Sequence, residues 1–280
     1  MQASIEHGVT TLDTAPFYGF GLSEEMIGKA IKGRDRSKIQ LLTKFGLVWD
    51  GSNGGKGEFF FDAERNGTSV PVYKYAAKES IIKEVEASLR RLGTDYIDLL
   101  QIHWPDSTTP IQETMEALDV LIGQGKIRVA GVSNYNVEQT AEAGKYLNVA
   151  SNQVSYSMLN RGIEQELVPF ALQHHLGIIA YSPMERGLLT GKYFQGSHLK
   201  ENDHRNGYFR QFDLPKVQAF LETLTPMAED KGATLQPGIT IVLAGARDAK
   251  QAIANAQSMD IHLSPDELQF INHELAKLQL

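Results

Sequence analysis

The chain of 280 residues contains no cysteine, which excludes disulfide bonds, thiolate zinc sites and cysteine nucleophiles. It has no apolar run long enough to span a bilayer, and its first residues, MQASIEHG, lack the apolar centre of a signal peptide. Basic residues are dispersed and the net charge is −7, which does not favour nucleic-acid binding. These absences predict a cytoplasmic protein that works neither on nucleic acid nor in a membrane.

The composition is that of an ordinary globular protein, with 42% apolar and 22% charged residues. A length of 280 residues suits one large α/β barrel or two smaller domains. No Gly-x-Gly-x-x-Gly follows any expected strand, which argues against the doubly wound dinucleotide-binding fold.

Apolar, β-branched runs alternate with amphipathic segments along the chain. The alternation predicts strands at residues 9–12, 39–45, 96–102, 127–132, 149–156, 177–180 and 239–243. It predicts helices at residues 4–7, 24–31, 79–92, 113–124, 137–146, 164–174, 216–231, 250–257 and 265–278. Strict alternation of this kind indicates a parallel sheet, open or closed into a barrel.

Two long segments interrupt the alternation, at residues 50–75 and 184–212. The first is rich in glycine and carries three adjacent phenylalanines at positions 59–61, and the second contains Gly-Leu-Leu-Thr-Gly-Lys. Loops this long in a compact domain usually have a functional role. The segment at residues 50–75 is either a lid over a pocket or a mobile surface loop, and the sequence does not decide between the two. We expect the irregular segments to select the substrate.

The carboxyl ends of the expected strands are polar, and in a βα barrel the active site lies at these ends. The residues there are Asp13, Lys44, His103, Ser133, Asn134, Gln153, Tyr181, Ser182 and Arg247, with Tyr18 close behind the first. Each residue alone has a plain explanation as a turn cap, a surface lysine or a core histidine. Their occurrence together, on successive strands, predicts an active site.

At this point the sequence resembles the aldo-keto reductase family. The segments that carry the resemblance are DTAPFYGFGLSEEMIGKAI, LLTKFG, DYIDLLQIHWPD, RVAGVSNY, SNQVSYS, IIAYSP, GLLTGKY and GARDAKQAIAN, in the family's order. The resemblance covers nearly the whole chain. It implies one domain over residues 1–280, and an NADP-dependent enzyme that reduces an aldehyde or ketone to an alcohol by hydride transfer from NADPH.

The resemblance assigns catalysis to Asp13, Tyr18, Lys44 and His103. Reduction of a carbonyl group needs a proton donor at its oxygen, and a free tyrosine, with a pKa of about 10, is a weak acid at neutral pH. Buried Lys44 is therefore expected to lower the pKa of Tyr18, while Asp13 holds and charge-balances the lysine. His103 is expected either to orient the carbonyl oxygen or to take part in a proton relay.

The resemblance also assigns the nicotinamide end of the cofactor. The hydroxyl and amide groups of Ser133, Asn134 and Gln153 would bind the carboxamide. Tyr181 would stack on the nicotinamide ring and decide which face gives the hydride.

The other end of the cofactor is assigned to later residues. Ser182 and the loop with Met184, Gly191 and Lys192 would cover the pyrophosphate, because its glycines allow close backbone approach. Arg247 would bind the adenosine 2′-phosphate, which favours NADPH over NADH. Gln251 and Asn255, one helical turn apart, would contact adenine, and a solvated helix face is the alternative for this pair.

Two segments of the family's pattern are missing. Family members begin with a further strand and most of a helix before the segment matching SIEHGVTTLDTAP, and carry a helix where Leu235 here precedes Gln236. The fold expectation is therefore an α/β protein, a (β/α)8 TIM-type barrel lacking its first strand and one outer helix. A numbering that closes over a gap in the chain is the alternative.

Two other functions stay open beside the reductase. The missing segments motivate a truncated or degenerate barrel that binds nicotinamide nucleotide or a partner subunit without turnover. A metal-dependent barrel hydrolase is disfavoured, because the strand ends supply one His and one Asp far apart in sequence and no second His at ligand spacing. We expect a small carbonyl substrate as the partner and no metal.

Overall fold

The computed structural model describes residues 1–194, 199–203, 205–231 and 241–278. Its contacts divide the chain into two units. The first unit comprises Met1–Ile5, Val9–Val154 and Gln165–Ile179, and the second comprises Glu6–Gly8, Ser155–Glu164 and Ala180–Leu280.

A parallel sheet forms the centre of the first unit. Its strands, in spatial order, are β1 (Thr11–Asp13), β2 (Gln40–Phe45), β6 (Ile97–Ile102), β7 (Ile127–Ser133), β8 (Val149–Ser155) and β9 (Gly177–Tyr181). The pairs from β1 to β8 are all parallel. Asp13 pairs with Leu42 and Lys44 with Gln101, so the polar strand ends lie on one edge, as parallel pairing requires.

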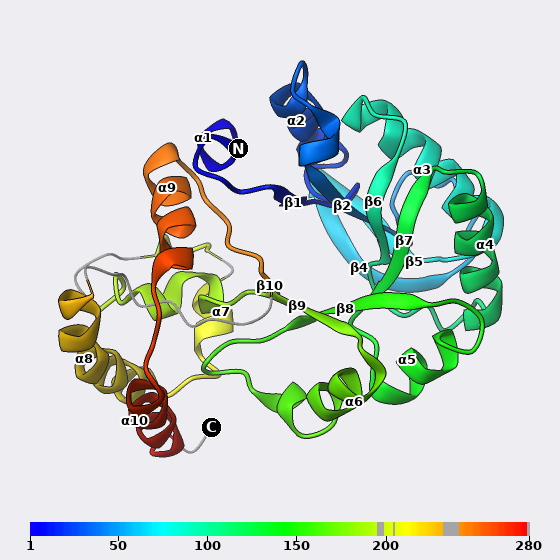
Figure 1. The fold of residues 1–280 in the computed structure, drawn as a ribbon. Coiled ribbons are helices and arrows are strands. Elements are labelled where there is room, and N and C mark those ends of the chain that lie inside the picture. The colour runs from blue at the N-terminus through cyan, green and yellow to red at the C-terminus, as the bar shows by residue number, and fades with distance from the viewer. Residues whose placement is uncertain (195–198, 204, 232–240, 279–280) are drawn as a thin grey trace. The chain divides into compact units, whose positions relative to one another are not determined.

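Helices follow the strands in the predicted alternation. They are α1 (Gln2–Glu6), α2 (Leu22–Ile31), η1 (Arg36–Lys38), α3 (Lys78–Leu92), α4 (Ile111–Gly123), α5 (Val137–Ala143) and α6 (Leu167–His174). Helices α2 to α5 pack each against the next (Figure 1). Their apolar sides and the sheet share one core, which includes Leu41, Val85, Leu100 and Leu118. The sequence predicts that this helix begins at Glu24, whereas α2 begins at Leu22, after Gly21 with a φ of 99°.

Residues 50–75 form an antiparallel hairpin and not the long loop expected from the sequence. Strands β3 (Leu47–Val48), β4 (Glu58–Arg65) and β5 (Thr68–Lys74) make a sheet in the order β3-β5-β4. Asn66 and Gly67 join β4 to β5 with φ values of 52° and 77°. Asn-Gly with two positive φ angles is the preferred two-residue hairpin turn. The sequence therefore contained a signal for a hairpin, and the expected long loop is wrong.

The second unit is mainly helical. Its elements are η2 (Gly162–Glu164), η3 (Glu185–Thr190), α7 (Arg205–Phe209), α8 (Leu214–Asp230), β10 (Ile241–Val242), α9 (Ala249–Gln257), η4 (Ser258–Asp260) and α10 (Pro265–Ala276). Beside β10, the amide of Leu243 donates to the carbonyl of Ala180 at 2.9 Å. Leu188 and Leu189 of η3 pack against α8 residues in the core of this unit.

The second long segment predicted from the sequence, residues 184–212, contains η3 and α7. The junction of Leu235 and Gln236, where the sequence predicts that one helix of the family pattern is absent, lies outside the described residues. Among the residues that are described, no helix combines the length and the apolar composition that crossing a membrane requires.

Gly28 allows α2 to lie directly on the end of α3. A Cβ atom on Gly28 would lie 2.7 Å from the Arg91 carbonyl oxygen and 2.8 Å from that of Leu92, both rigid backbone atoms. Gly28→Ala should therefore destabilise the fold by about 1–3 kcal/mol, as overpacking does, measured by urea unfolding. Gly123→Ala is the matched control, since nothing lies within 4 Å of its Cβ position, and it should be neutral or stabilising. Equal stability of both variants would contradict this account.

Glu84 of α3 binds the backbone just beyond Lys44. Its carboxyl group accepts hydrogen bonds from the Gly46 amide at 2.9 Å and the Ser80 hydroxyl at 3.2 Å. Burial, and to a smaller extent the charge of Asp50, raise the pKa of Glu84 to about 8, although these hydrogen bonds act in the opposite direction. The folded protein therefore keeps a proton that the unfolded chain releases near pH 4.5, so stability falls as pH rises between these values and is level above the upper one.

Glu84→Gln should remove this part of the pH dependence. The variant should gain stability relative to the wild type as pH rises from 5 to 8, measured by urea unfolding at pH 5, 7 and 9. Glu79→Gln, an exposed substitution on the same helix, is the control and should follow the wild-type curve. If the difference in free energy of unfolding between Glu84→Gln and the wild type is the same at all three pH values, the carboxyl group does not titrate in this range.

Candidate active site

A buried ion pair joins the ends of β1 and β2. The Lys44 ammonium lies 2.7 Å from Asp13 Oδ2 and also donates to the Thr14 carbonyl at 2.9 Å. Lys44 is 1% exposed. Burial lowers the pKa of Lys44, while the charge of Asp13 and the hydrogen bond to it act in the opposite direction. An ammonium this deeply buried needs such a partner, because an unpaired charge in the interior is costly.

Tyr18 lies beside this pair, in the turn that follows β1. Its ring centroid is 5.2 Å from the Lys44 ammonium, and 41% of the residue is exposed. Partial burial of the side chain, and then the negative charge of Asp13, raise the pKa of Tyr18 above its ordinary value. The expected lowering by Lys44 is therefore wrong for this structure. The lysine directs its hydrogen bonds to Asp13 and Thr14, so Asp13 balances its charge at the phenol.

His103, at the end of β6, completes the group. Its ring centroid is 5.6 Å from that of Tyr18, with the rings nearly perpendicular. Burial, and then the charge of Lys44, lower the pKa of His103 to about 3. The imidazole is therefore neutral at physiological pH. Of the two roles open from the sequence, this favours orienting a carbonyl oxygen over supplying a proton as imidazolium.

Gln153 links this group to β8. Its Nε2 donates to Asp13 Oδ1 at 2.9 Å, so the aspartate accepts from Gln153 on one oxygen and from Lys44 on the other. The Ser133 hydroxyl and the backbone amide of Asn134 both donate to the backbone carbonyl of Gln153, at 2.8 and 3.0 Å. Four of the predicted strand ends are thus joined through hydrogen bonds.

Asn134 occupies the left-handed region, with a φ of 61°. Its side-chain nitrogen donates to the His103 carbonyl at 3.0 Å and to the Ser133 hydroxyl at 3.2 Å. A hydroxyl and two amides concentrated at one rim match the acceptor and two donors of a carboxamide. The donor set of the first unit therefore fits a nicotinamide group.

A cluster of aromatic side chains includes the chain neighbours of Tyr18 and His103, and two of its members, Phe60 and Phe61, come from the segment predicted as a long loop. The cluster consists of Phe17, Phe20, Trp49, Phe60, Phe61 and Trp104. Phe61 of β4 contacts Phe17 with ring centroids 5.6 Å apart, and Phe60 contacts Trp104 at 5.3 Å. Since Phe17 precedes Tyr18 and Trp104 follows His103, the hairpin is attached to the rim at two points.

In the second unit, the predicted pyrophosphate segment follows β9. Tyr181 is the last residue of β9, and Ser182 adopts a φ of 57°. Met184 precedes η3, and Gly191 ends it with a φ of 73°. Exposed Lys192 follows, with its ammonium 4.9 Å from the centroid of the Tyr193 ring. The chain here is compact and kinked, not extended.

Arg247 is exposed in the loop before α9. Within the described residues its guanidinium makes no hydrogen bond or ion pair, while its amide donates to the Gln251 side chain at 3.0 Å. The Asn255 side chain donates to the Gly245 carbonyl at 3.3 Å. Both predicted adenine contacts therefore hold the loop that carries Arg247.

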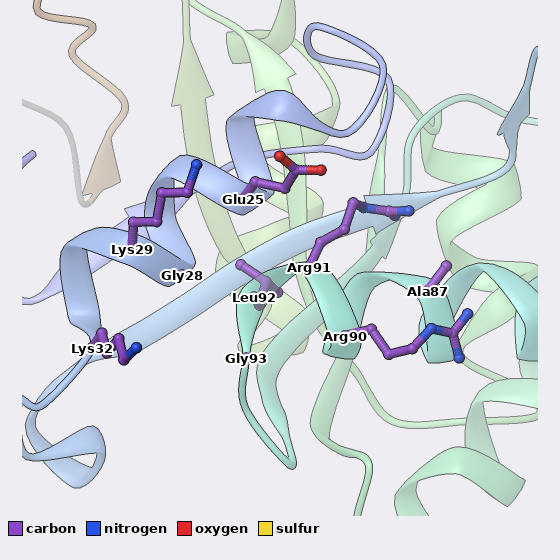
Figure 2. Close-up of a pocket in the computed structure, with 9 residues that line it drawn as sticks. All are labelled: Glu25, Gly28, Lys29, Lys32, Ala87, Arg90, Arg91, Leu92 and Gly93. Atoms are coloured by element: carbon purple, nitrogen blue, oxygen red, sulfur yellow. The ribbon is translucent and has the colours of Figure 1, made fainter.

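A surface groove between α2 and α3 contains none of the candidate residues (Figure 2). Its charged side chains are Glu25, Lys29, Lys32, Arg90 and Arg91. The four basic residues stand at the carboxyl ends of the two helices, where they complement the helix dipoles. Helix stabilisation explains them, and the groove is separate from the ion pair of Asp13 and Lys44.

Comparison with known proteins supports one family. A model described as the aldo/keto reductase family matches residues 1–274. The aldo-keto reductase YhdN of Bacillus subtilis (strain 168) is 34% identical over 290 residues, which cover 97% of this chain and 81% of YhdN. An NADH-specific methylglyoxal reductase of Escherichia coli (strain K12) is 34% identical over 270 residues, covering 92% of this chain and 80% of the relative.

Solved structures agree with the sequence comparisons. The glycerol dehydrogenase AKR11B4 from Gluconobacter oxydans has a TM-score of 0.86 at 33% identity, covering 99% of this chain and 84% of that one. An aldo-keto reductase from Klebsiella pneumoniae in complex with NADPH has a TM-score of 0.70 at 30% identity, covering 97% and 82%. The predicted (β/α)8-type fold is confirmed by these similarities. The chain belongs to the aldo/keto reductase family.

Proposed function

We propose that the protein reduces an aldehyde or ketone to an alcohol by hydride transfer from NADPH, with Tyr18 as the proton donor. The observation that carries the proposal is the buried pair of Lys44 and Asp13 at 2.7 Å with Tyr18 beside it. A neutral phenol next to a neutral imidazole can donate one proton and one orienting hydrogen bond to a carbonyl oxygen. We propose the cytoplasm as the place where it acts.

The cofactor supplies the hydride, and the residues of this chain supply binding and the proton. In the first unit, Ser133, Asn134 and Gln153 are proposed to hold the nicotinamide carboxamide. In the second unit, Tyr181 is proposed to stack on the nicotinamide, with Ser182 and residues 184–192 at the diphosphate and Gln251 and Asn255 at adenine. The raised pKa of Tyr18 keeps the phenol protonated at neutral pH, which is the form that a reduction needs.

The choice of NADPH rests on Arg247. Its guanidinium is exposed and makes no hydrogen bond or ion pair within the described part of the chain, and a guanidinium fork matches the geometry of a phosphate. The Klebsiella pneumoniae neighbour was solved with NADPH, whereas the Escherichia coli relative is named as NADH-specific. The two relatives differ in their cofactor, and we propose that Arg247 gives this chain its preference for NADPH.

The β4–β5 hairpin is proposed to form one wall of the substrate pocket. Two of its aromatic rings contact the neighbours of Tyr18 and His103 in the chain. An aromatic wall of this kind accepts the apolar part of a carbonyl compound.

Tyr18→Phe should lower turnover of a reactive aldehyde by about 10²–10⁴-fold, because it removes the general acid. Consumption of NADPH measures turnover, and quenching of NADPH fluorescence measures binding, which should stay within about twofold of wild type. Tyr146→Phe is the control, since it removes an exposed phenol and should leave both unchanged. Turnover that survives Tyr18→Phe would refute the role of Tyr18, and binding without turnover in the wild type would support the non-catalytic alternative.

Arg247→Ala should raise the KM for NADPH by about 10- to 100-fold, the loss expected for a charged hydrogen bond. The KM for NADH should change by less than about twofold, because NADH lacks the 2′-phosphate. Arg210→Ala removes an exposed arginine of the same unit and controls for net charge. Equal losses with both cofactors would contradict the assignment of Arg247.

A further inference from the structure

The second unit buries a carboxylate that the proposed reaction does not use. Glu185, at the start of η3, is 0% exposed. Within the described residues no basic side chain forms an ion pair with it. A buried polar group without partners is costly, so this carboxyl group needs hydrogen-bond donors close to its oxygens.

Two hydroxyl groups provide those hydrogen bonds. The Ser157 hydroxyl donates to Glu185 Oε1. It accepts from the amides of Leu159 and Asn160, at 3.1 and 3.0 Å, which leaves its own proton for the carboxylate. The Tyr208 hydroxyl donates to Glu185 Oε2 at 2.5 Å. Burial, and then the hydrogen bond to Glu185, raise the pKa of Tyr208 to about 12, so the tyrosine stays a donor.

The backbone at Glu185 is unusual. Glu185, Arg186 and Gly187 have φ values of 45°, 54° and 94°, so three consecutive residues occupy the left-handed region, two of them with side chains. Non-glycine residues adopt this region at a cost in energy and persist there only when surrounding contacts hold them. The Glu185 carboxylate supplies one such contact.

Tyr208 of α7 holds the neighbouring residue as well. The Arg186 guanidinium lies 3.8 Å from the centroid of the Tyr208 ring, a cation–π contact. One tyrosine therefore fixes Glu185 through its hydroxyl and Arg186 through its ring. On the far side of the kink, Leu188 and Leu189 are buried in the core of the second unit.

The fixed segment is the one assigned to the diphosphate of the cofactor. Its two exposed cations, Arg186 and Lys192, stand at either end of the kinked stretch, and Gly187 and Gly191 let the backbone turn between them. We propose that Glu185 is a positioning residue whose carboxylate, clamped between Ser157 and Tyr208, sets the left-handed backbone and so shapes residues 184–192 for the diphosphate of a nicotinamide dinucleotide. The inference rests on the proposed function.

The clamp is tested with Tyr208→Phe, which removes one oxygen atom and keeps the ring beneath Arg186. This variant should raise the Kd for NADPH at least about 10-fold, as measured by fluorescence. Its kcat at saturating NADPH and its KM for the aldehyde should stay within about twofold of wild type. Tyr146→Phe, which also removes a tyrosine hydrogen bond to a glutamate, at 3.0 Å from Glu142, is the matched control and should change none of these values.

A second ligand separates positioning from general damage. Adenosine 2′-monophosphate lacks the diphosphate bridge, so its Kd should be the same for wild type and Tyr208→Phe. Glu185→Gln should raise the Kd for NADPH in the same way. The double variant Glu185→Gln with Tyr208→Phe should be no weaker than the poorer single variant, because the two residues act through one hydrogen bond.

Three outcomes would overturn the proposal: an unchanged Kd for NADPH in Tyr208→Phe, a Kd for adenosine 2′-monophosphate that rises in parallel with it, or additive losses in the double variant. If Glu185→Gln does not fold, the comparison of Tyr208→Phe with Tyr146→Phe still decides. A wild-type protein that does not bind NADPH would instead refute the proposed function, so the two failures are distinguishable.

Discussion

The ion pair between Lys44 and Asp13 is the interaction on which the rest of the site depends. It places a full positive charge where only 1% of the lysine reaches solvent, and Asp13 is also the acceptor for Gln153. The strands β1, β2 and β8 are therefore joined at their carboxyl ends through one carboxylate. Without Asp13, the buried Lys44 ammonium would lose its counter-ion and keep only the Thr14 carbonyl, and the Gln153 side chain would lose its acceptor. Such losses are larger than the net value of the pair itself.

Burial and this ion pair together keep the two neighbouring side chains neutral. Burial, and then the charge of Lys44, lower the pKa of the His103 imidazole. Burial, and then the charge of Asp13, raise the pKa of Tyr18. In both cases the charge of the pair acts in the same direction as burial. A neutral donor and a neutral orienting group suit a reaction in which a carbonyl oxygen gains negative charge and then a proton.

The strand-end set was predictable from the sequence, because parallel strands bring their carboxyl ends to one edge whatever the details of packing. The sign of the pKa shift at Tyr18 was not, since it depends on which oxygen Asp13 turns toward Lys44 and how near the phenol lies. The hairpin could have been predicted from its Asn66-Gly67 turn. The glycine-rich residues that precede β4 instead favoured a long loop. The burial of Glu185 could not be predicted from the sequence, because its partners Ser157 and Tyr208 are distant in the chain and only the fold brings them to it.

The most direct test of the account is the pH dependence of a single turnover, with NADPH-loaded enzyme mixed with excess aldehyde. The account predicts hydride transfer at a rate that is constant from about pH 5 to pH 7.5, because neither Tyr18 nor His103, with a pKa of about 3, changes its charge there. An absence of hydride transfer would contradict it. So would a rate that follows an ionisation near pH 6.5, the ordinary value for histidine, and loses that dependence in His103→Asn.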